Sequence, residues 1–203
     1  MTPFQFESEF FRLMLSYNLD HIVRFHNSLQ ALLREKLNAE AADDPMLQST
    51  IELYDKMNSA NSLLTALGFL DEMLILFWRR CFPGVPIPAS SKSRSMKKRY
   101  EDLWNQLGVH LETMPCWEVL RDAMKIRHCL LHANGRIEFM KDPNDIRACI
   151  KRYPNALDEN LDRVIVTSHF LQRCVVAIRG LKDQMLNGLP APTVPQSGST
   201  PSL

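Results

Sequence analysis

The residues best suited to chemistry lie in the segment 115–135, which reads PCWEVLRDAMKIRHCLLHANG. On a helical wheel at about 100° per residue, four potential cations share a stripe roughly 60° wide. They are Arg121, Lys125, His128 and His132. Guanidinium, ammonium and imidazolium groups in one stripe suit an anionic ligand, and phosphate is the commonest biological candidate. The segment therefore predicts an anion-binding helix face.

Arg127 lies outside this stripe, within a broad apolar arc of the same wheel. Its neighbours on the wheel are Val119, Ala123, Ile126 and Leu130 on one side and Leu120, Met124 and Leu131 on the other. An arginine is unexpected there unless an anion or a partner protein meets it. Alternatively, its long side chain extends past the apolar neighbours to reach water. The wheel position leaves these options open.

Two other interpretations of the cationic stripe remain open. Such a stripe on an amphipathic helix is most often a solvated face, and basic residues near the end of a helix also complement its dipole. His128 and His132, four residues apart, have the spacing of a metal-binding pair. However, basic residues surround them, and neither an H-E-x-x-H pattern nor a further ligand pattern is present. We therefore expect no metal and no cofactor.

The run Arg127-His128-x-x-x-His132-Ala-Asn134-Gly135 resembles the R-x(4–6)-H motif of the HEPN superfamily (higher eukaryotes and prokaryotes nucleotide-binding domains). In that family the motif lies near the C-terminus of a helix late in a helical bundle. The residue after the arginine is typically polar, and His128 occupies that place here. The resemblance implies a HEPN-like helical fold over residues 1–187.

The resemblance also implies a metal-independent endoribonuclease, in which the RNA 2′-hydroxyl attacks the neighbouring phosphodiester. This reaction needs a base, an acid and positive charge near the developing phosphorane. Histidine transfers protons near neutral pH, and a guanidinium binds phosphate oxygens at two points. We therefore expect His132 to transfer protons, Arg127 to bind and stabilise the phosphate, and His128 to position substrate or share the acid–base work. Further substrate contacts are expected from Arg121, Lys125 and Asn134.

Many HEPN proteins are toxins or effectors in toxin–antitoxin, abortive-infection or other antiviral systems, and they usually work as dimers. The resemblance therefore implies RNA, a second copy of this chain and a separately encoded antitoxin or sensor as partners. The wheel also favours a homodimer through the segment 115–132, because its wide apolar arc leaves Leu120, Met124 and Leu131 for a second protomer. Two alternatives stay open: a non-catalytic HEPN-like module that binds a nucleotide or a protein, and a helical adaptor without anion chemistry.

A second basic cluster lies at 92–99, which reads KSRSMKKR. Lys97 and Lys98 in this cluster are expected to contact the RNA backbone in a salt-sensitive manner, or else to belong to a solvated loop and helix start. Trp104 and Trp117 have rings that could stack on bases, but large aromatic residues in a bundle are more often core. The remaining histidines have no partner pattern and are expected to be structural: His21, His26, His110 and His169.

The helical periodicity indicates which elements position these residues. Residues 4–44 lack glycine and proline, and their apolar residues recur at steps of three, four and seven, which predicts a helix ending near Asn38. Asp44 and Pro45 predict the N-cap and first residue of a second long helix. Further helices are expected over 96–107, 115–133 and 171–187, with a long loop between the second and third helices.

The fold class predicted from this pattern is all-α, an antiparallel bundle of about five helices in one domain over 1–187. Alternating apolar residues at Ile137 and Phe139, and at Val164 and Val166, leave a short β-hairpin open before the last helix. The tail 188–203 has no charged residue and four prolines, so we expect it to be disordered.

The composition indicates an ordinary globular chain of 203 residues, with 24 Lys and Arg against 23 Asp and Glu. That balance excludes a generally polycationic nucleic-acid coat and an acidic disordered chain, so any anion site must be local. The five scattered cysteines contain no C-x-x-C pair, which favours a reduced, cytoplasmic protein. The N-terminus lacks a basic segment, and Asp71 and Glu72 interrupt the most apolar stretch. We therefore expect no signal peptide and no membrane span.

Overall fold

The computed structural model describes residues 3–40, 44–81, 100–101, 105 and 110–188. Within these ranges the chain is mostly helical, with five α-helices and one short antiparallel β-hairpin just before the last helix. The predicted fold class is therefore confirmed. Most of the predicted helix over 96–107, including Lys97, Lys98 and Trp104, lies outside these ranges, as does the tail from residue 189.

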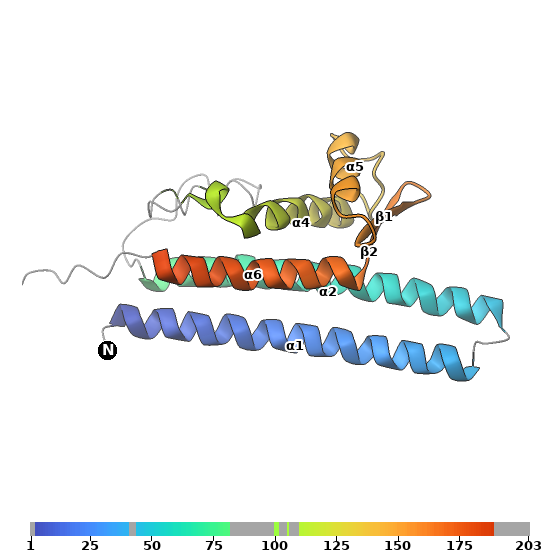
Figure 1. Cartoon of the computed structure of the whole chain (residues 1–203), viewed down its shortest axis with the longest axis horizontal. Coiled ribbons are helices and arrows are strands. Elements are labelled where there is room, and N and C mark those ends of the chain that lie inside the picture. The colour runs from blue at the N-terminus through green and yellow to red at the C-terminus, as the bar shows by residue number, and fades with distance from the viewer. Residues whose placement is uncertain (1–2, 41–43, 82–99, 102–104, 106–109, 189–203) are drawn as a thin grey trace, which may run out of the picture.

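The elements in chain order are α1 (Pro3–Glu40), α2 (Pro45–Cys81), a single 3₁₀ turn η2 (Leu111–Thr113), α4 (Pro115–His132), α5 (Pro143–Arg152), β1 (Leu157–Asn160), β2 (Arg163–Val166) and α6 (Ser168–Gly188). Successive long helices run in opposite directions (Figure 1). In the same view α6 runs beside α2, while α5 and the hairpin lie at the end of α4 where that helix stops. The C-terminal half of α4 therefore faces a small layer formed by α5 and the hairpin.

The second of the two longest helices begins where the sequence predicts, and α1 ends at Glu40, two residues after the expected Asn38. The Asp44 carboxylate Oδ1 accepts hydrogen bonds from the backbone N–H groups of Met46 at 2.9 Å and Leu47 at 3.1 Å, and Pro45 is the first helical residue. This confirms the predicted cap, which satisfies two of the free N–H groups at the start of α2. With 38 and 37 residues, α1 and α2 are each about 56 Å long at 1.5 Å per residue.

The core lies where α1, α2, α4 and α6 meet. Fully buried aliphatic and aromatic side chains from all four helices form one continuous cluster, which includes Leu15, Leu19, Leu63, Leu67, Leu120, Ile126, Phe170 and Ile178. Each such side chain contributes about 1.5–3 kcal/mol relative to full exposure. Trp117 belongs to the same cluster and is 2% exposed, so it is a core residue and not a base-stacking platform. This rigid core holds α4 in place.

The hairpin is confirmed, but its first strand is not the one suggested by Ile137 and Phe139. β1 pairs with β2 in antiparallel register, with Leu157 opposite Val166. The segment at Ile137 instead forms turns, which an isolated bridge between Arg136 and Arg163 joins to β2. Ile137 is buried and Phe139 is 69% exposed. The two apolar residues therefore alternate in sequence because a turn buries one side chain and exposes the other.

The helix α5 is absent from the sequence-based prediction. It has only ten residues and begins with Pro143 at its first position. Two of its side chains, Ile146 and Cys149, are buried at helical spacing. Ten residues give too few apolar repeats for a clear period, which is why the sequence pattern over 136–162 is weak.

One described helix, over Pro45–Arg80, is long and apolar enough to cross a membrane by length and composition alone. The sequence-based expectation of no membrane span considered only the most apolar stretch around Asp71 and Glu72, which is shorter than this helix. In the folded chain 44% of the most apolar window is buried against other elements, and the core helix of a soluble protein passes the same test.

Candidate functional site

The site is built at the C-terminal half of α4 and in the turn that ends it. The helix stops at His132, and the backbone N–H groups of Ala133 and Gly135 both reach the carbonyl oxygen of Cys129, at 3.0 and 3.1 Å. Asn134 and Gly135 adopt left-handed backbone angles, with φ of 49° and 77°. Asparagine and glycine tolerate that conformation best, so the Ala-Asn-Gly sequence stops the helix. The chain then turns back along α4.

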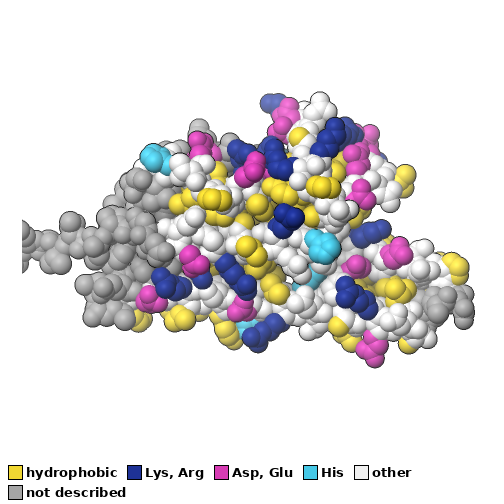
Figure 2. Space-filling view, viewed as in Figure 1, with side chains coloured by type: hydrophobic (Ala, Val, Ile, Leu, Met, Phe, Trp, Pro, Cys, Tyr) yellow, Lys and Arg dark blue, Asp and Glu magenta, His cyan; other side chains and the backbone are white. Residues whose placement is uncertain are grey.

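The turn and α5 enclose a pocket of about 510 Å³ against α4. Five residues predicted from the helical wheel line it together: Arg121, Lys125, Arg127, His128 and His132. The facing wall consists of Phe139, Met140, Lys141 and Asp142 from the turn segment and Asp145 and Ile146 from α5, with Met124 and Ala133 completing the lining. The cationic stripe is therefore one wall of a concave site and not only a solvated face. In Figure 2, basic and acidic side chains both occur over α4 and α5 on the face shown.

Arg127 is the least satisfied cation of this wall. Its Nε is buried and has no hydrogen-bond partner. Within the described part of the chain its guanidinium also has no carboxylate within 4.0 Å, whereas Lys125 Nζ lies 3.1 Å from Asp145 Oδ2 and Arg121 lies 3.8 Å from Glu118. A buried donor without a partner costs about 1–3 kcal/mol. An anion entering the pocket would meet an arginine that no protein carboxylate neutralises.

His128 and His132 form a pair of imidazoles along the same wall. Their ring centroids are 4.5 Å apart and the rings are tilted by 49°, as expected for residues four apart on a helix. The pKa of His128 is lowered from its usual value, first by desolvation and then by the positive charges of His132 and Arg127. His128 is therefore predominantly neutral at pH 7 and can accept a proton.

A buried carboxylate holds α5 in place against α4. Asp122 is fully buried in α4, and its Oδ2 accepts hydrogen bonds from the Arg152 guanidinium and from the Tyr153 hydroxyl, the latter at 3.2 Å. Arg152 also lies 3.6 Å from Glu118, and the pKa of Arg152 is raised first by its hydrogen bond to Asp122 and the charge of that carboxylate, and less by the charge of Glu118. Sequence reasoning missed Asp122, because on the α4 wheel it lies about 40° beyond Ile126, next to the apolar arc and not within it.

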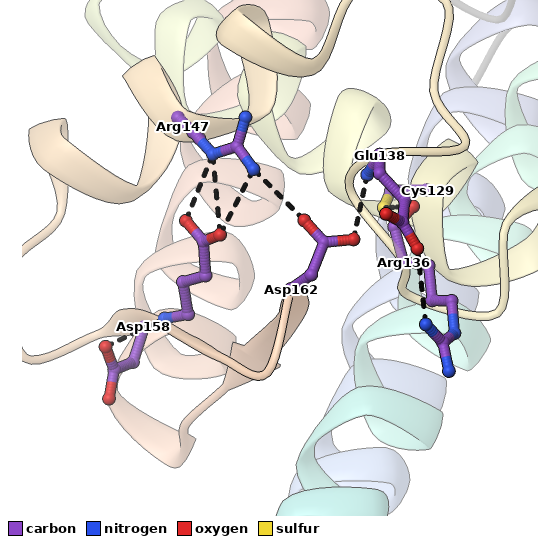
Figure 3. A network of polar contacts seen from close by, with 7 residues as sticks. Cys129, Arg136, Glu138, Arg147, Asp158 and Asp162 are labelled. Atoms are coloured by element: carbon purple, nitrogen blue, oxygen red, sulfur yellow. Dashed lines mark hydrogen bonds and ion pairs between the residues drawn. The ribbon is translucent and has the colours of Figure 1, made fainter.

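A second polar network fixes the turn that forms the other wall (Figure 3). Arg147 donates to both carboxylate oxygens of Glu159, at 3.3–3.4 Å, and to Asp162 Oδ1 at 3.0 Å. Asp162 Oδ2 then accepts from the backbone N–H of Glu138 at 3.0 Å, and its carbonyl accepts from Ile137 N–H at 2.9 Å. The hairpin thus holds the turn at a defined position against α4.

Three residues lie in places that do not fit the roles predicted for them from the sequence. Asn134 does not line the pocket. Its backbone carbonyl accepts a hydrogen bond from the Arg163 side chain at 3.0 Å, so Asn134 is part of the turn after α4. Leu120 and Met124 are 0% and 7% exposed and pack inside the chain, so they are not available to a second protomer. Leu131 remains 49% exposed.

Within the described ranges, no group of three or more His, Cys, Asp or Glu side chains is arranged to hold a metal ion. His128 and His132 therefore have no third candidate ligand among those residues.

No family model matches the chain, and neither a curated protein nor a solved structure significantly similar to it was found. The geometry described above is therefore the basis for any functional assignment.

Proposed function

We propose that the α4–α5 pocket binds the phosphodiester backbone of RNA and that the protein is a metal-independent endoribonuclease of the HEPN type. The observation that supports this most directly is the convergence of Arg127, His128 and His132 on one pocket. An arginine without a protein carboxylate beside two imidazoles provides phosphate binding and proton transfer in one place.

Each residue then has a defined role. Arg127 contacts two non-bridging phosphate oxygens and stabilises the charge that grows in the transition state. His128, with its lowered pKa, accepts the proton of the 2′-hydroxyl, and His132 donates a proton to the departing 5′-oxygen. The rings lie close enough for both to reach one linkage. Arg121 and Lys125 contact neighbouring phosphates.

The biological setting follows from the HEPN resemblance and belongs to the same proposal. The protein would act in the cytoplasm as a toxin or an antiviral, abortive-infection effector, restrained by a separately encoded antitoxin or sensor. We place the homodimer contact near the C-terminal end of α4, where Leu131 remains exposed beside the pocket residue His132. A two-fold axis there would bring two pockets together.

A non-catalytic HEPN-like module that binds nucleotides is the second candidate. The apolar lining of the pocket favours it, because Met124, Met140 and Ile146 are not needed to bind phosphate alone. A pocket with cations on one side and apolar side chains on another suits a whole nucleotide.

RNA cleavage in the presence of EDTA tests the proposal. Wild-type protein should produce fragments ending in 2′,3′-cyclic phosphate, and His132→Ala should lower the rate by about 10²–10⁴-fold. His110→Ala is the matched control, because His110 is exposed, lies outside the pocket and makes no side-chain cap hydrogen bond. Its rate should equal that of the wild type. Nucleotide binding without cleavage by the wild type would favour the second candidate instead.

A further inference from the structure

The turn wall of the pocket presents an exposed aromatic ring. Phe139 lines the pocket and is 69% exposed, so most of its ring is free to contact a ligand. The ring is not on a loose loop: Ile137 beside it is buried, and the backbone N–H of Glu138 is bonded to Asp162. The chain therefore holds this ring at the pocket while leaving most of it in water.

Contacts around Phe139 also orient the ring. The Arg136 guanidinium lies 5.7 Å from the ring centroid, and it is itself held by Glu138 at 3.2 Å. A cation above an aromatic ring is attracted to its electron-rich face. This contact fixes the ring from one side.

We propose that Phe139 stacks on an unpaired nucleobase next to the phosphate bound by Arg127, so that the pocket recognises single-stranded RNA. This rests on the proposed RNA-binding function and specifies its substrate class. A pocket of about 510 Å³ is within the size range of small-molecule sites. The cationic α4 wall matches the phosphate of a nucleotide, and the apolar side chains of Phe139 and Met140 on the turn wall match its base. Base–aromatic stacking is available only where the base is free of a duplex.

Asp142 adds a preference among bases. It occupies the N-cap position of α5, yet its side chain makes no capping hydrogen bond, and it lines the pocket. A carboxylate accepts hydrogen bonds but donates none, so it favours bases with an exocyclic amino group. Adenine, cytosine and guanine carry such a group, whereas uracil has only its N3–H donor, flanked by two carbonyl oxygens that the carboxylate repels. The site therefore prefers bases with an exocyclic amino group, such as adenine, to uracil.

The test measures binding of 2′-O-methyl RNA, in which the attacking hydroxyl is blocked. Wild-type protein should bind a short single-stranded oligoadenylate more tightly than an abasic strand of equal length or a duplex. Phe139→Ala should weaken oligoadenylate binding by about 5- to 100-fold and leave abasic binding unchanged. Phe139→Trp should retain the wild-type affinity, because the larger ring also stacks. Thermal unfolding of each variant checks that the fold is intact.

Base preference is tested with oligouridylate in the same assay. Asp142→Asn should reduce the preference for oligoadenylate over oligouridylate, because the amide can donate to the uracil carbonyl. Equal wild-type affinity for base-containing and abasic strands, or for single strands and duplex, would overturn the stacking proposal even if unmodified RNA is cleaved. Conversely, base-dependent binding without cleavage of unmodified RNA would retain the stacking proposal and overturn the nuclease.

Discussion

Histidines occupy two contrasting regions of this molecule, the centre of the helical bundle and the α4 wall of the pocket. His26 in α1 is 3% exposed, and its ring nitrogens lie 3.1 Å from Asn58 Nδ2, 3.3 Å from Ser62 Oγ and 3.2 Å from Ser168 Oγ. These partners come from α2 and α6, so one imidazole joins three helices.

The pocket histidines have the opposite surroundings. His128 and His132 are exposed, and within the described residues neither ring makes a hydrogen bond to the protein. They contact each other and line a pocket with Arg127. Polar partners therefore distinguish an imidazole that stabilises the fold from one that remains free for a ligand. We therefore expect substitutions in the pocket to change activity and substitutions at His26 to change stability.

The largest expected effect is on catalysis, at Arg127. Arg127→Ala should reduce RNA cleavage by about 10²–10³-fold, comparable to removing one transition-state hydrogen-bond donor. Arg127→Lys should recover only part of this loss, because an ammonium cannot contact two phosphate oxygens in the planar arrangement of a guanidinium. The free energy of unfolding should not fall by more than about 0.5 kcal/mol, because Arg127 makes no hydrogen bond or ion pair in the described chain and its removal relieves a buried unpartnered donor. Single-turnover rates and urea unfolding measure the two quantities.

Arg24→Ala is the matched control for Arg127, since Arg24 is exposed on α1 and lies outside the pocket. It should leave both the cleavage rate and the unfolding free energy unchanged. An Arg127→Ala protein that cleaves RNA at the wild-type rate would remove this residue from the proposed mechanism.

A smaller effect, on stability, is expected at His26. His26→Ala should lower the free energy of unfolding by about 2–4 kcal/mol, because it leaves a cavity and removes a hydrogen-bond partner from buried Asn58 and Ser62. His21→Ala, five residues earlier on α1 and exposed, should change it by less than about 0.5 kcal/mol. Below the unfolding temperature, cleavage by His26→Ala should match the wild type. Equal unfolding midpoints for the two variants would break the contrast between the regions.

The predicted site residues that the structure brings to one pocket share one helix. Residues 121, 125, 128 and 132 are separated by three or four positions, so helix geometry alone places them on one face. The cap at Asp44 and the stop at Gly135 were also predictable, because each depends on a few adjacent residues.

The opposite wall could not be predicted from local patterns. Phe139 and Asp145 reach the pocket only because the turn and α5 fold back onto α4, through contacts of Asp122 with Arg152 and of Asp162 with Arg147. Charged residues at those positions look like an ordinary solvated surface in the sequence. Leu120 and Met124 were assigned to a dimer interface because a wheel cannot show how many neighbours a helix has within its own chain.

The smallest expected effect is on the pH dependence of stability, and it separates the two kinds of histidine. Burial lowers the pKa of His26 in the folded protein from its usual 6.5, although Asp55 opposes the shift. The unfolded chain therefore binds protons at a higher pH than the folded one, so stability falls as the pH decreases below 6.5 and levels off below the folded pKa. The pKa of His128 is also lowered, and its contribution has the same sign.

Salt distinguishes the two contributions. Desolvation lowers the pKa of His128 most, and the charges of His132 and Arg127 lower it further. Those charges lie at an exposed pocket and are screened by salt, whereas the burial that lowers the pKa of His26 is not. Thermal unfolding midpoints of the wild type should therefore fall from pH 7 to pH 5, with only a small change in slope at high salt. His26→Gln should flatten the profile, and His128→Gln should leave most of the slope but remove its salt dependence. A flat wild-type profile would mean that the His26 ring is protonated as readily inside the bundle as in the unfolded chain.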